Sequence, residues 1–348
     1  MTTMREVAAA AGVSAKTVSR VFNDDPHVTP ETRARVEVAL RQLNYVPNAV
    51  ATTFRTGRSP VVGIAVPDIV DPFFAAIAKS VGRLATQHGM STVVTSLGED
   101  MQKEADVVGR LLSQSLSGLI IAPVAAGHAY LEPWKDRLPI VFVDRRPVRL
   151  AADSFTEDDR GGALMATRHL VEHGHRRIAF VSDTPDLPTS HSRLLGYRAA
   201  LAETGIGENP DYEVHGAVDR GSAAGALRKL MELAEPPTAI MSSNARSSMA
   251  LVPALREHGL AIVGFGDFPM ADMLDPAITV IDQDPYALGT LAAQRVFDRL
   301  GHPGRRYRRR TVLPVTLVER ASCRAAAWSG PRSETADGHA TAERADRR

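Results

Sequence analysis

The chain has 348 residues, of which 44% are hydrophobic, and its 41 Lys and Arg against 40 Asp and Glu give a net charge of +1. This length allows about two or three domains, and the balanced charge produces no global field that attracts nucleic acid. The only cysteine, Cys323, excludes an internal disulfide framework and a cysteine metal cage. We find no basic leader with an apolar run behind it and no apolar stretch of about 18 residues, so we expect a soluble cytoplasmic protein without a membrane partner.

The first stretch, residues 3–23, predicts two short helices separated by a glycine. Thr3 and Glu6 have the spacing of a capping box that begins a helix. Gly12 interrupts the apolar pattern, and Ser14 restarts it. The second helix offers small side chains and hydrogen-bond donors of the kind that a DNA major groove accepts at base edges and phosphates. This helix-turn-helix pattern therefore indicates DNA as a partner.

A third helix is predicted from Thr29-Pro30-Glu31 to about Leu43, because a capping residue, a proline and an acid stand at its start. Residues 48–55 could form one or two helical turns, which are marginal alone because nucleation is costly. Residues 56–60 (TGRSP) are typical of a linker. The chain up to Arg58 holds eight basic and five acidic residues, so this part is mildly basic.

From Val61 the pattern changes to alternating strands and helices. The apolar runs of the first set are VVGIAVPDI, STVVTS, GLIIAP and IVFVDR, and those of the second set are RRIAFVSD, YEVHGAVD, TAIMSSN, LAIVGFGD and ITVIDQ. The helices expected between them include 73–88, 103–114, 161–173 and 194–203. Runs that are apolar on both faces are typical of parallel strands covered by helices. The fold class is therefore α/β, with a helix-turn-helix headpiece, two doubly wound parallel-sheet lobes and a cleft between the lobes.

The pattern V-A-x-x-A-G-V-S-x-x-T-V-S-R-V-x-N at Val7 to Asn23, with N-Y-x-P-N at Asn44 to Asn48, resembles the lactose-repressor (LacI/GalR) family of bacterial transcription regulators. The resemblance continues more loosely to about Arg320. It implies a DNA-binding headpiece (1–46), a hinge helix and linker (47–60) and a two-lobed effector-binding and dimerisation domain (61–320) that resembles a periplasmic sugar-binding protein. Family members exchange segments between lobes, which implies a first lobe of 61–157 and 285–305 and a second of 158–284 and 306–320. The resemblance implies that a helix at 285–300 returns to the first lobe and that a strand at 311–318 rejoins the second.

The remaining tail, residues 321–348, has no sustained apolar period, so we expect disorder there. It also lacks the leucine heptads of a tetramer-forming coiled coil. We therefore expect a homodimer, and a two-fold dimer implies a near-palindromic double-stranded operator.

The resemblance assigns DNA-reading roles position by position. Ala15, Lys16 and Arg20 match base-reading positions, with Arg20 a candidate for paired hydrogen bonds to guanine and Lys16 equally able to grip a phosphate. The positions that match sugar-phosphate contacts are Thr17, Ser19, Asn23, His27, Thr32, Tyr45 and Asn48. In the hinge, Ala51 and Phe54 match contacts with DNA. Phe54 stands where the family usually has a leucine wedge for the minor groove, and the alternative is that it packs on the core domain.

The candidate effector residues follow from strand ends and from the resemblance. They are Asp71, Phe73, Phe74, Asp144, Asp159, Arg193, Asn244 and Asp267. The aromatic rings could stack on a sugar or base, or belong to the core, and Arg193 could instead form a surface salt bridge. The usual Asn-Asp pair reads Asn244-Ala245 here, and Asp267 or Asp282 could replace the missing carboxylate. A sugar or sugar derivative is the commonest effector of the family.

Two weaker signals remain. His169, His173 and His175 could supply one face of a metal site, but the local sequence places no acid or thiol with them, so we interpret them as the end of a helix before Gly174 and predict no metal. The basic run 305–310 resembles a nucleic-acid patch, but between a helix and a strand it is typical of an exposed turn.

These observations predict a repressor whose affinity for operator DNA is set by a small molecule between the lobes. No nucleophile elbow or P-loop is present, so we expect neither an enzyme nor a cofactor. The alternatives are a sugar-binding receptor without a DNA role and an enzyme built on the same lobes. The first fifty-eight residues argue against both, since neither needs a DNA headpiece.

Overall fold

The structure is a computed structural model that describes residues 2–22, 25–45 and 60–324. Its internal contacts divide the chain into a headpiece that ends at Pro60 and a unit that begins at Val61. The predicted contact residues Asn23, Asn48, Ala51 and Phe54 lie outside the described residues. No helix in the described ranges combines the length and the apolar character that a membrane-spanning segment needs.

In the headpiece, the described helices are α1 (Met4–Ala11), α2 (Ala15–Phe22) and α3 (Pro30–Gln42). The predicted capping box is present, because the Glu6 amide donates to the Thr3 hydroxyl and the Thr3 amide donates to the Glu6 carboxylate at 2.7 Å. The chain turns between α1 and α2 with a φ of +63° at residue 12, which a glycine adopts without strain. Apolar side chains from all of these helices form one small core.

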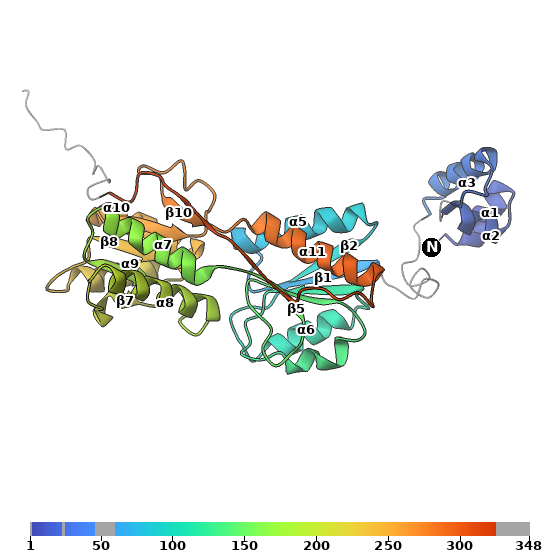
Figure 1. Ribbon diagram of the computed structural model, residues 1–348. Coiled ribbons are helices and arrows are strands. Elements are labelled where there is room, and N and C mark those ends of the chain that lie inside the picture. The colour runs from blue at the N-terminus through green and yellow to red at the C-terminus, as the bar shows by residue number, and fades with distance from the viewer. Residues whose placement is uncertain (1, 23–24, 46–59, 325–348) are drawn as a thin grey trace, which may run out of the picture. The chain divides into compact units, whose positions relative to one another are not determined.

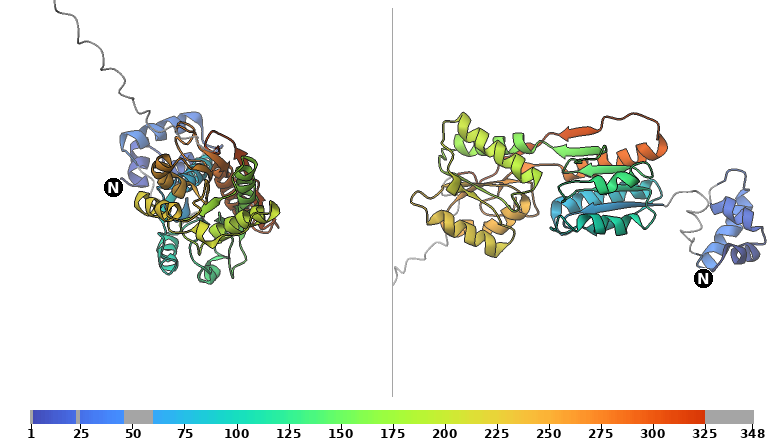
Figure 2. Two further views of the ribbon diagram at one scale, coloured as in Figure 1. Left: turned by 90° about the vertical axis from the view of Figure 1, so that its left-hand side faces the viewer. Right: turned by 90° about the horizontal axis from the view of Figure 1, so that it is seen from below.

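The first lobe is a parallel sheet covered by helices on both faces (Figures 1 and 2). Within the described residues its strands are β1 (Val61–Val66), β2 (Ser91–Ser96), β3 (Gly118–Ile121), β4 (Ile140–Val143), β5 (Asp153–Glu157) and β11 (Arg310–Leu313), in the order β11-β5-β4-β3-β1-β2. Helices α5 (Pro72–Gln87) and α11 (Pro285–Gly301) cover one face, and α6 (Glu104–Leu112) and the 3-10 helix η1 (Ala129–Trp134) cover the other.

The second lobe repeats this arrangement. Its described strands are β6 (Ile178–Val181), β7 (Glu213–Val214), β8 (Ala239–Ser242), β9 (Ala261–Phe265), β10 (Thr279–Asp282) and β12 (Thr316–Val318), in the order β12-β10-β9-β8-β6-β7. Helices α7 (Asp159–Glu172) and α8 (Pro188–Glu203) pack on one face, while α9 (Arg220–Met231) and α10 (Ala245–His258) pack on the other, and the 3-10 helix η2 (Pro210–Tyr212) precedes β7. Strand β12 is antiparallel to β10.

The chain passes between the lobes after β5, after β10 and after β11, and Figure 1 shows these three connecting segments. The predicted strand at 311–318 is wrong in one respect: it is two strands, with β11 in the first sheet and β12 in the second. Pro314 stands between them and has no N–H for a sheet ladder. The second lobe therefore resumes after β11, not at residue 306.

Two further segments differ from the sequence expectation. Strand β5 (DSFTE) carries no apolar run, yet every one of its residues is buried, and Asp153 is held there by Arg299 at 2.9 Å. The sequence predicts a disordered tail from residue 321, but Ser322 and Cys323 are fully buried in the second lobe. The Ser322 hydroxyl accepts from the Thr279 amide and donates to the Ile262 carbonyl, which fixes this segment against the sheet.

Helix α11 packs closely on α5 because Gly289 has no side chain. A Cβ at this position would lie 2.6 Å from the carbonyl oxygen of Ile77 and 2.9 Å from its Cα. We predict that Gly289→Ala lowers the free energy of unfolding in urea by about 1–3 kcal/mol, because the two backbones must separate.

The matched control is Gly109→Ala on the exposed side of α6, where an added Cβ meets nothing within 4 Å. This change is expected to raise the free energy of unfolding by about 0.5–1 kcal/mol. Equal effects of the two substitutions would contradict the close packing of α5 and α11.

Candidate functional site

The outer face of α2 presents the side chains that the sequence assigns to DNA reading. Ala15, Lys16 and Arg20 are exposed, whereas Val18 and Val21 of the same helix are buried in the headpiece core. Of the predicted phosphate-contact residues, His27 is exposed, and Thr17, Ser19, Thr32 and Tyr45 are half-buried. One face of helix α2 therefore packs in the headpiece core, and the other exposes the hydrogen-bond donors of Lys16 and Arg20 to solvent.

The carboxylate of Asp25 interacts with both Arg20, near the end of this helix, and His27. The Arg20 guanidinium lies 3.6 Å from the carboxylate of Asp25, and its side chain remains 53% exposed. The same carboxylate accepts from the His27 amide at 2.9 Å and lies 3.0 Å from the His27 ring. These contacts lower the pKa of Asp25, with the hydrogen bonds from His27 as the main cause. Asp25 therefore stays ionised and restrains two donors without covering them.

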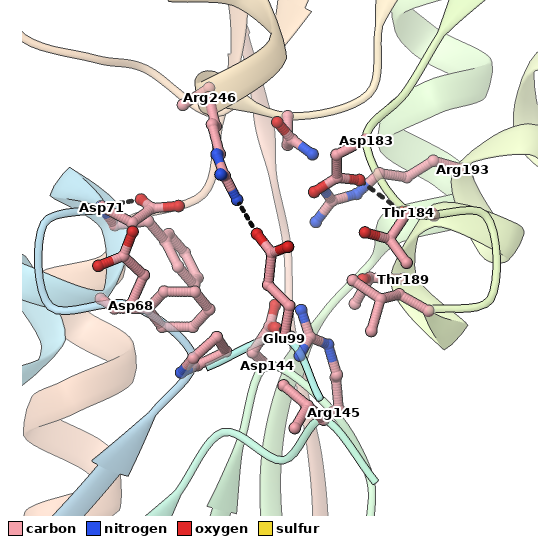
Figure 3. A pocket seen from close by; sticks show the side chains of 18 of the residues that line it. Asp68, Asp71, Glu99, Asp144, Arg145, Asp183, Thr184, Thr189, Arg193 and Arg246 are labelled. Atoms are coloured by element: carbon pink, nitrogen blue, oxygen red, sulfur yellow. Dashed lines mark hydrogen bonds and ion pairs between the residues drawn. The ribbon is translucent and has the colours of Figure 1, made fainter. Parts of the chain in front are cut away.

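The second candidate site is a pocket between the lobes with an empty volume of about 910 Å³, counted with its open mouth (Figure 3). It lies at the carboxyl ends of parallel strands from both sheets, which is where doubly wound lobes bind ligands. Its lining includes Asp71, Phe73, Phe74, Asp144, Arg193 and Asn244 from the predicted set. Asp159 lies behind the lining, against Arg193.

Arg193 of α8 is a buried charge in the lining of the pocket. Its guanidinium donates to the Asp159 carboxylate at 2.8 Å and to the Ser243 carbonyl at 2.6 Å, and it lies 3.9 Å from the centre of the Phe265 ring. The side chain is buried. The alternative of a surface salt bridge is therefore wrong. A buried guanidinium with a carboxylate partner is costly to break, since the remaining charge would be left unpaired.

Further carboxyl groups surround this pair. Burial raises the pKa of Asp159 to about 6, against the opposing effect of Arg193. Burial also raises the pKa of Glu157 well above its ordinary value, and the nearby Asp144 adds to the shift. Both carboxyl oxygens of Glu157 are buried without a hydrogen-bond partner. Burial therefore favours the neutral form of the Glu157 carboxyl.

Local structure fixes the polar and aromatic groups of the wall. Asp71 begins α5 and accepts from the Phe73 amide at 2.9 Å, and Asn244 begins α10 and accepts from the Ser247 amide at 2.8 Å. The rings of Phe73 and Phe74 meet edge to face with centroids 5.1 Å apart. The pocket therefore offers an aromatic surface on the first lobe and a helix start on each lobe.

Several charged lining residues were not identified from the sequence. They are Asp68, Glu99, Arg145, Asp183 and Arg246. Asp68 and Asp183 follow strands β1 and β6, so the rule that ligands bind at strand ends could have found them. Glu99 also follows a strand, β2, but no local pattern shows that it faces Arg246 across the cleft.

An ion pair joins the two lobes at this pocket. Glu99 follows β2 in the first lobe, Arg246 lies in the first turn of α10 in the second lobe, and their side chains are 2.5 Å apart, as the dashed line in Figure 3 shows. The Arg246 guanidinium also donates to the Val218 carbonyl at 3.1 Å. The carboxylate side chain of Glu99 is 66% exposed, so the pair is screened by solvent and contributes little to stability alone.

The structure corrects one predicted residue and replaces another. Asp267 does not line the pocket, because both of its carboxylate oxygens accept from Arg320, at 3.0 and 2.6 Å. Asp282 does not line it either, but the next residue, Gln283, does. Gln283 is buried, and its Nε2 has no hydrogen-bond partner. The polar group offered by this strand end is therefore an amide donor.

Two family models match parts of this chain. Residues 3–48 match the model of bacterial regulatory proteins of the lacI family, and residues 167–323 match that of a periplasmic binding protein-like domain. The chain is 30% identical over 298 residues to catabolite control protein A of Priestia megaterium, covering 83% of this chain and 90% of that protein. It is 29% identical over 330 residues to the ribose operon repressor of Escherichia coli K12, covering 92% and 100%.

Among solved structures, the chain is similar to the crystal structure of the lac repressor dimer bound to operator and the anti-inducer ONPF. The TM-score is 0.81 at 28% sequence identity, and the match covers 93% of this chain and 99% of that chain. The headpiece, the lobes and the degree of similarity lead to one conclusion: the chain belongs to the lacI family of bacterial regulatory proteins and is a DNA-binding transcription regulator.

Proposed function

We propose that this protein is a cytoplasmic, dimeric repressor that binds a near-palindromic operator and whose operator affinity is set by a neutral, polyhydroxylated effector in the inter-lobe pocket. The observation that carries the DNA part is the exposed row of Ala15, Lys16 and Arg20 on a helix whose other face is core. The names of the similar repressors and the operator-bound lac repressor dimer support it.

The charges of the pocket favour a neutral ligand. Its described lining holds five carboxylates and three guanidinium groups, a formal net charge of −2. Each guanidinium already has a carboxylate partner: Arg145 pairs with Asp144, Arg193 with Asp159, and Arg246 with Glu99. A phosphate group would therefore meet excess negative charge, whereas hydroxyl groups can donate to carboxylates and a sugar ring can lie against Phe73 and Phe74.

Linkage explains how such a ligand would act on DNA binding. The pocket is built from both lobes, so a ligand held by groups on both sides has a different affinity for each lobe arrangement. The lobe arrangement that it favours then biases the headpieces of the dimer toward or away from the operator. Only this difference in affinity can shift the equilibrium.

For the headpiece, we predict that Arg20→Ala lowers affinity for the selected operator by about 10- to 100-fold, because a paired contact to a guanine is lost. The operator is first isolated from a random duplex library with the full chain, and affinities are then measured by gel shift at fixed salt. Affinity for random DNA is expected to change much less.

The control for this experiment is Arg110→Ala, which removes the same charge from an exposed position of α6 in the other unit. It should leave operator affinity unchanged. If the library yields no near-palindromic site, or if both variants lose affinity equally, the proposed reading face is contradicted.

For the pocket, we predict opposite effects of Gln283→Met on stability and on ligand response. The buried Nε2 of Gln283 has no partner, so its removal should leave the melting temperature of the free protein unchanged or slightly higher. The same change should reduce the rise in melting temperature that a ligand produces. The ligand is found by a thermal-shift screen of neutral mono- and disaccharides beside their phosphates.

Gln87→Met, at the exposed end of α5, serves as the control and should keep the full ligand response. A screen in which only phosphorylated compounds raise the melting temperature would reject the neutral effector while leaving the DNA-binding role intact.

For the ion pair across the cleft, we predict that Glu99→Gln and Arg246→Gln each lower affinity for the screened ligand by up to about fivefold. The double variant should be no weaker than the weaker single variant, because an exposed pair couples by at most about 1 kcal/mol. The measurement is a double-mutant cycle on ligand affinity at low and high salt, and the coupling should shrink at high salt.

Glu203→Gln is the matched control, since Glu203 pairs with Arg168 at 2.5 Å on the surface of the second lobe alone. It should not change ligand affinity. Additive effects of the Glu99 and Arg246 substitutions would show that the pair does not hold the lobes together.

A further inference from the structure

The fold brings together four potential metal ligands on the second lobe, away from the pocket. His169 and His173 stand four residues apart at the end of α7, and Glu319 and Cys323 come from the segment that follows β12. One ligand atom from each lies within 4.8 Å of the other three. The sequence interpretation of these histidines as only a helix end is therefore incomplete. Their acid and thiol neighbours are supplied by a segment that is about 150 residues away in the chain.

The burial of His169 and the hydrogen bond of His173 both favour metal binding. The His169 side chain belongs to a residue that is only 5% exposed, and its Nε2 is buried with no hydrogen-bond partner. The His173 Nδ1 lies 2.9 Å from the His169 carbonyl oxygen, so it carries the proton and donates to that oxygen. This contact leaves the Nε2 lone pair of His173 directed at the cluster, the usual arrangement of a metal-binding histidine.

We propose that His169, His173, Cys323 and Glu319 bind a divalent ion of the zinc class. The donor set of two imidazoles, a thiolate and a carboxylate is one that Zn²⁺ accepts in tetrahedral geometry. Zinc bond lengths require neighbouring N, O and S ligands to be about 3.3–3.7 Å apart. The His173 Nε2 is already 3.5 Å from the Cys323 sulfur and 3.8 Å from the Glu319 carboxylate.

The surroundings hold the buried ligand in place and leave a route for the ion. His175 lies 3.2 Å from the Cys323 carbonyl through Nε2 and 2.9 Å from the Thr238 hydroxyl through Nδ1, so it positions the Cys323 backbone and is not itself a ligand. Glu319 is exposed and His173 is half-buried, which opens the cluster to solvent on one side. On binding, the thiol proton leaves to solvent and a sulfur–metal bond forms.

The experiment uses Co²⁺ as a spectroscopic probe for the full chain, purified without a histidine tag, reduced and stripped with a chelator. We expect one equivalent of Co²⁺ to bind with the intense visible bands of a tetrahedral site and a near-ultraviolet thiolate-to-metal band, and one equivalent of Zn²⁺ to remove both. Zn²⁺ at about 100 times its Kd should raise the melting temperature by about 5 °C.

The variants separate the proposed site from other histidines. Cys323→Ser should abolish the thiolate band and the rise in melting temperature with Zn²⁺. His258→Gln, which removes an exposed histidine from the end of α10, should keep both. A wild-type spectrum like that of aqueous Co²⁺, or a band that persists in Cys323→Ser, would overturn the proposal. The wild-type spectrum alone is decisive even if the serine variant does not fold.

Discussion

The burial of the Arg193 guanidinium under the pocket is the constraint that determines which charged groups surround it. A charge removed from water has to be compensated nearby, and Asp159 does so directly from the start of α7. Burial alone would lower the pKa of Arg193, but Asp159 and, to a smaller extent, Asp144 of the first lobe favour the charged form, so the pKa is raised. The compensation therefore draws on both lobes. A change in their separation would therefore alter the electrostatics of the surface that the proposed ligand contacts.

Two ion pairs of the pocket differ in how much they stabilise the folded protein. Loss of one partner of a buried pair such as Arg193 and Asp159 costs about 3–5 kcal/mol, because it strands a charge. The exposed pair of Glu99 and Arg246 contributes at most about 1 kcal/mol and weakens in salt. The buried pair thus belongs to the folded state of the second lobe, while the exposed pair adds little to the free energy of unfolding. Such a difference suits the proposed regulator, since contacts that change on ligand binding should not be those that stabilise the fold.

Features governed by neighbours in sequence were predictable, and features governed by tertiary partners were not. The capping box at Thr3 follows from local hydrogen bonding, and the position of Asp144 in the pocket follows from the strand before it. Asp267 was misassigned because its partner, Arg320, is 53 residues away. Strand β5 was not predicted because its residues form no apolar run, and the cation that holds Asp153 in the sheet, Arg299, is 146 residues away, which no local pattern reveals. Apolar periodicity identifies strands only where apolar packing is what buries them.

Helix α7 runs from the pocket to the proposed metal site of the second lobe. It begins at Asp159, beneath the pocket, and ends beside the cluster of His169, His173, Glu319 and Cys323, over 14 residues or about 21 Å. A metal ion at its far end would join the helix to the segment after β12, which follows the last passage of the chain between the lobes. Both of these elements already belong to the second lobe. Metal binding would therefore stiffen that lobe as one body, and its effect should fall on lobe stability, while ligand affinity stays with the surfaces that face each other across the cleft.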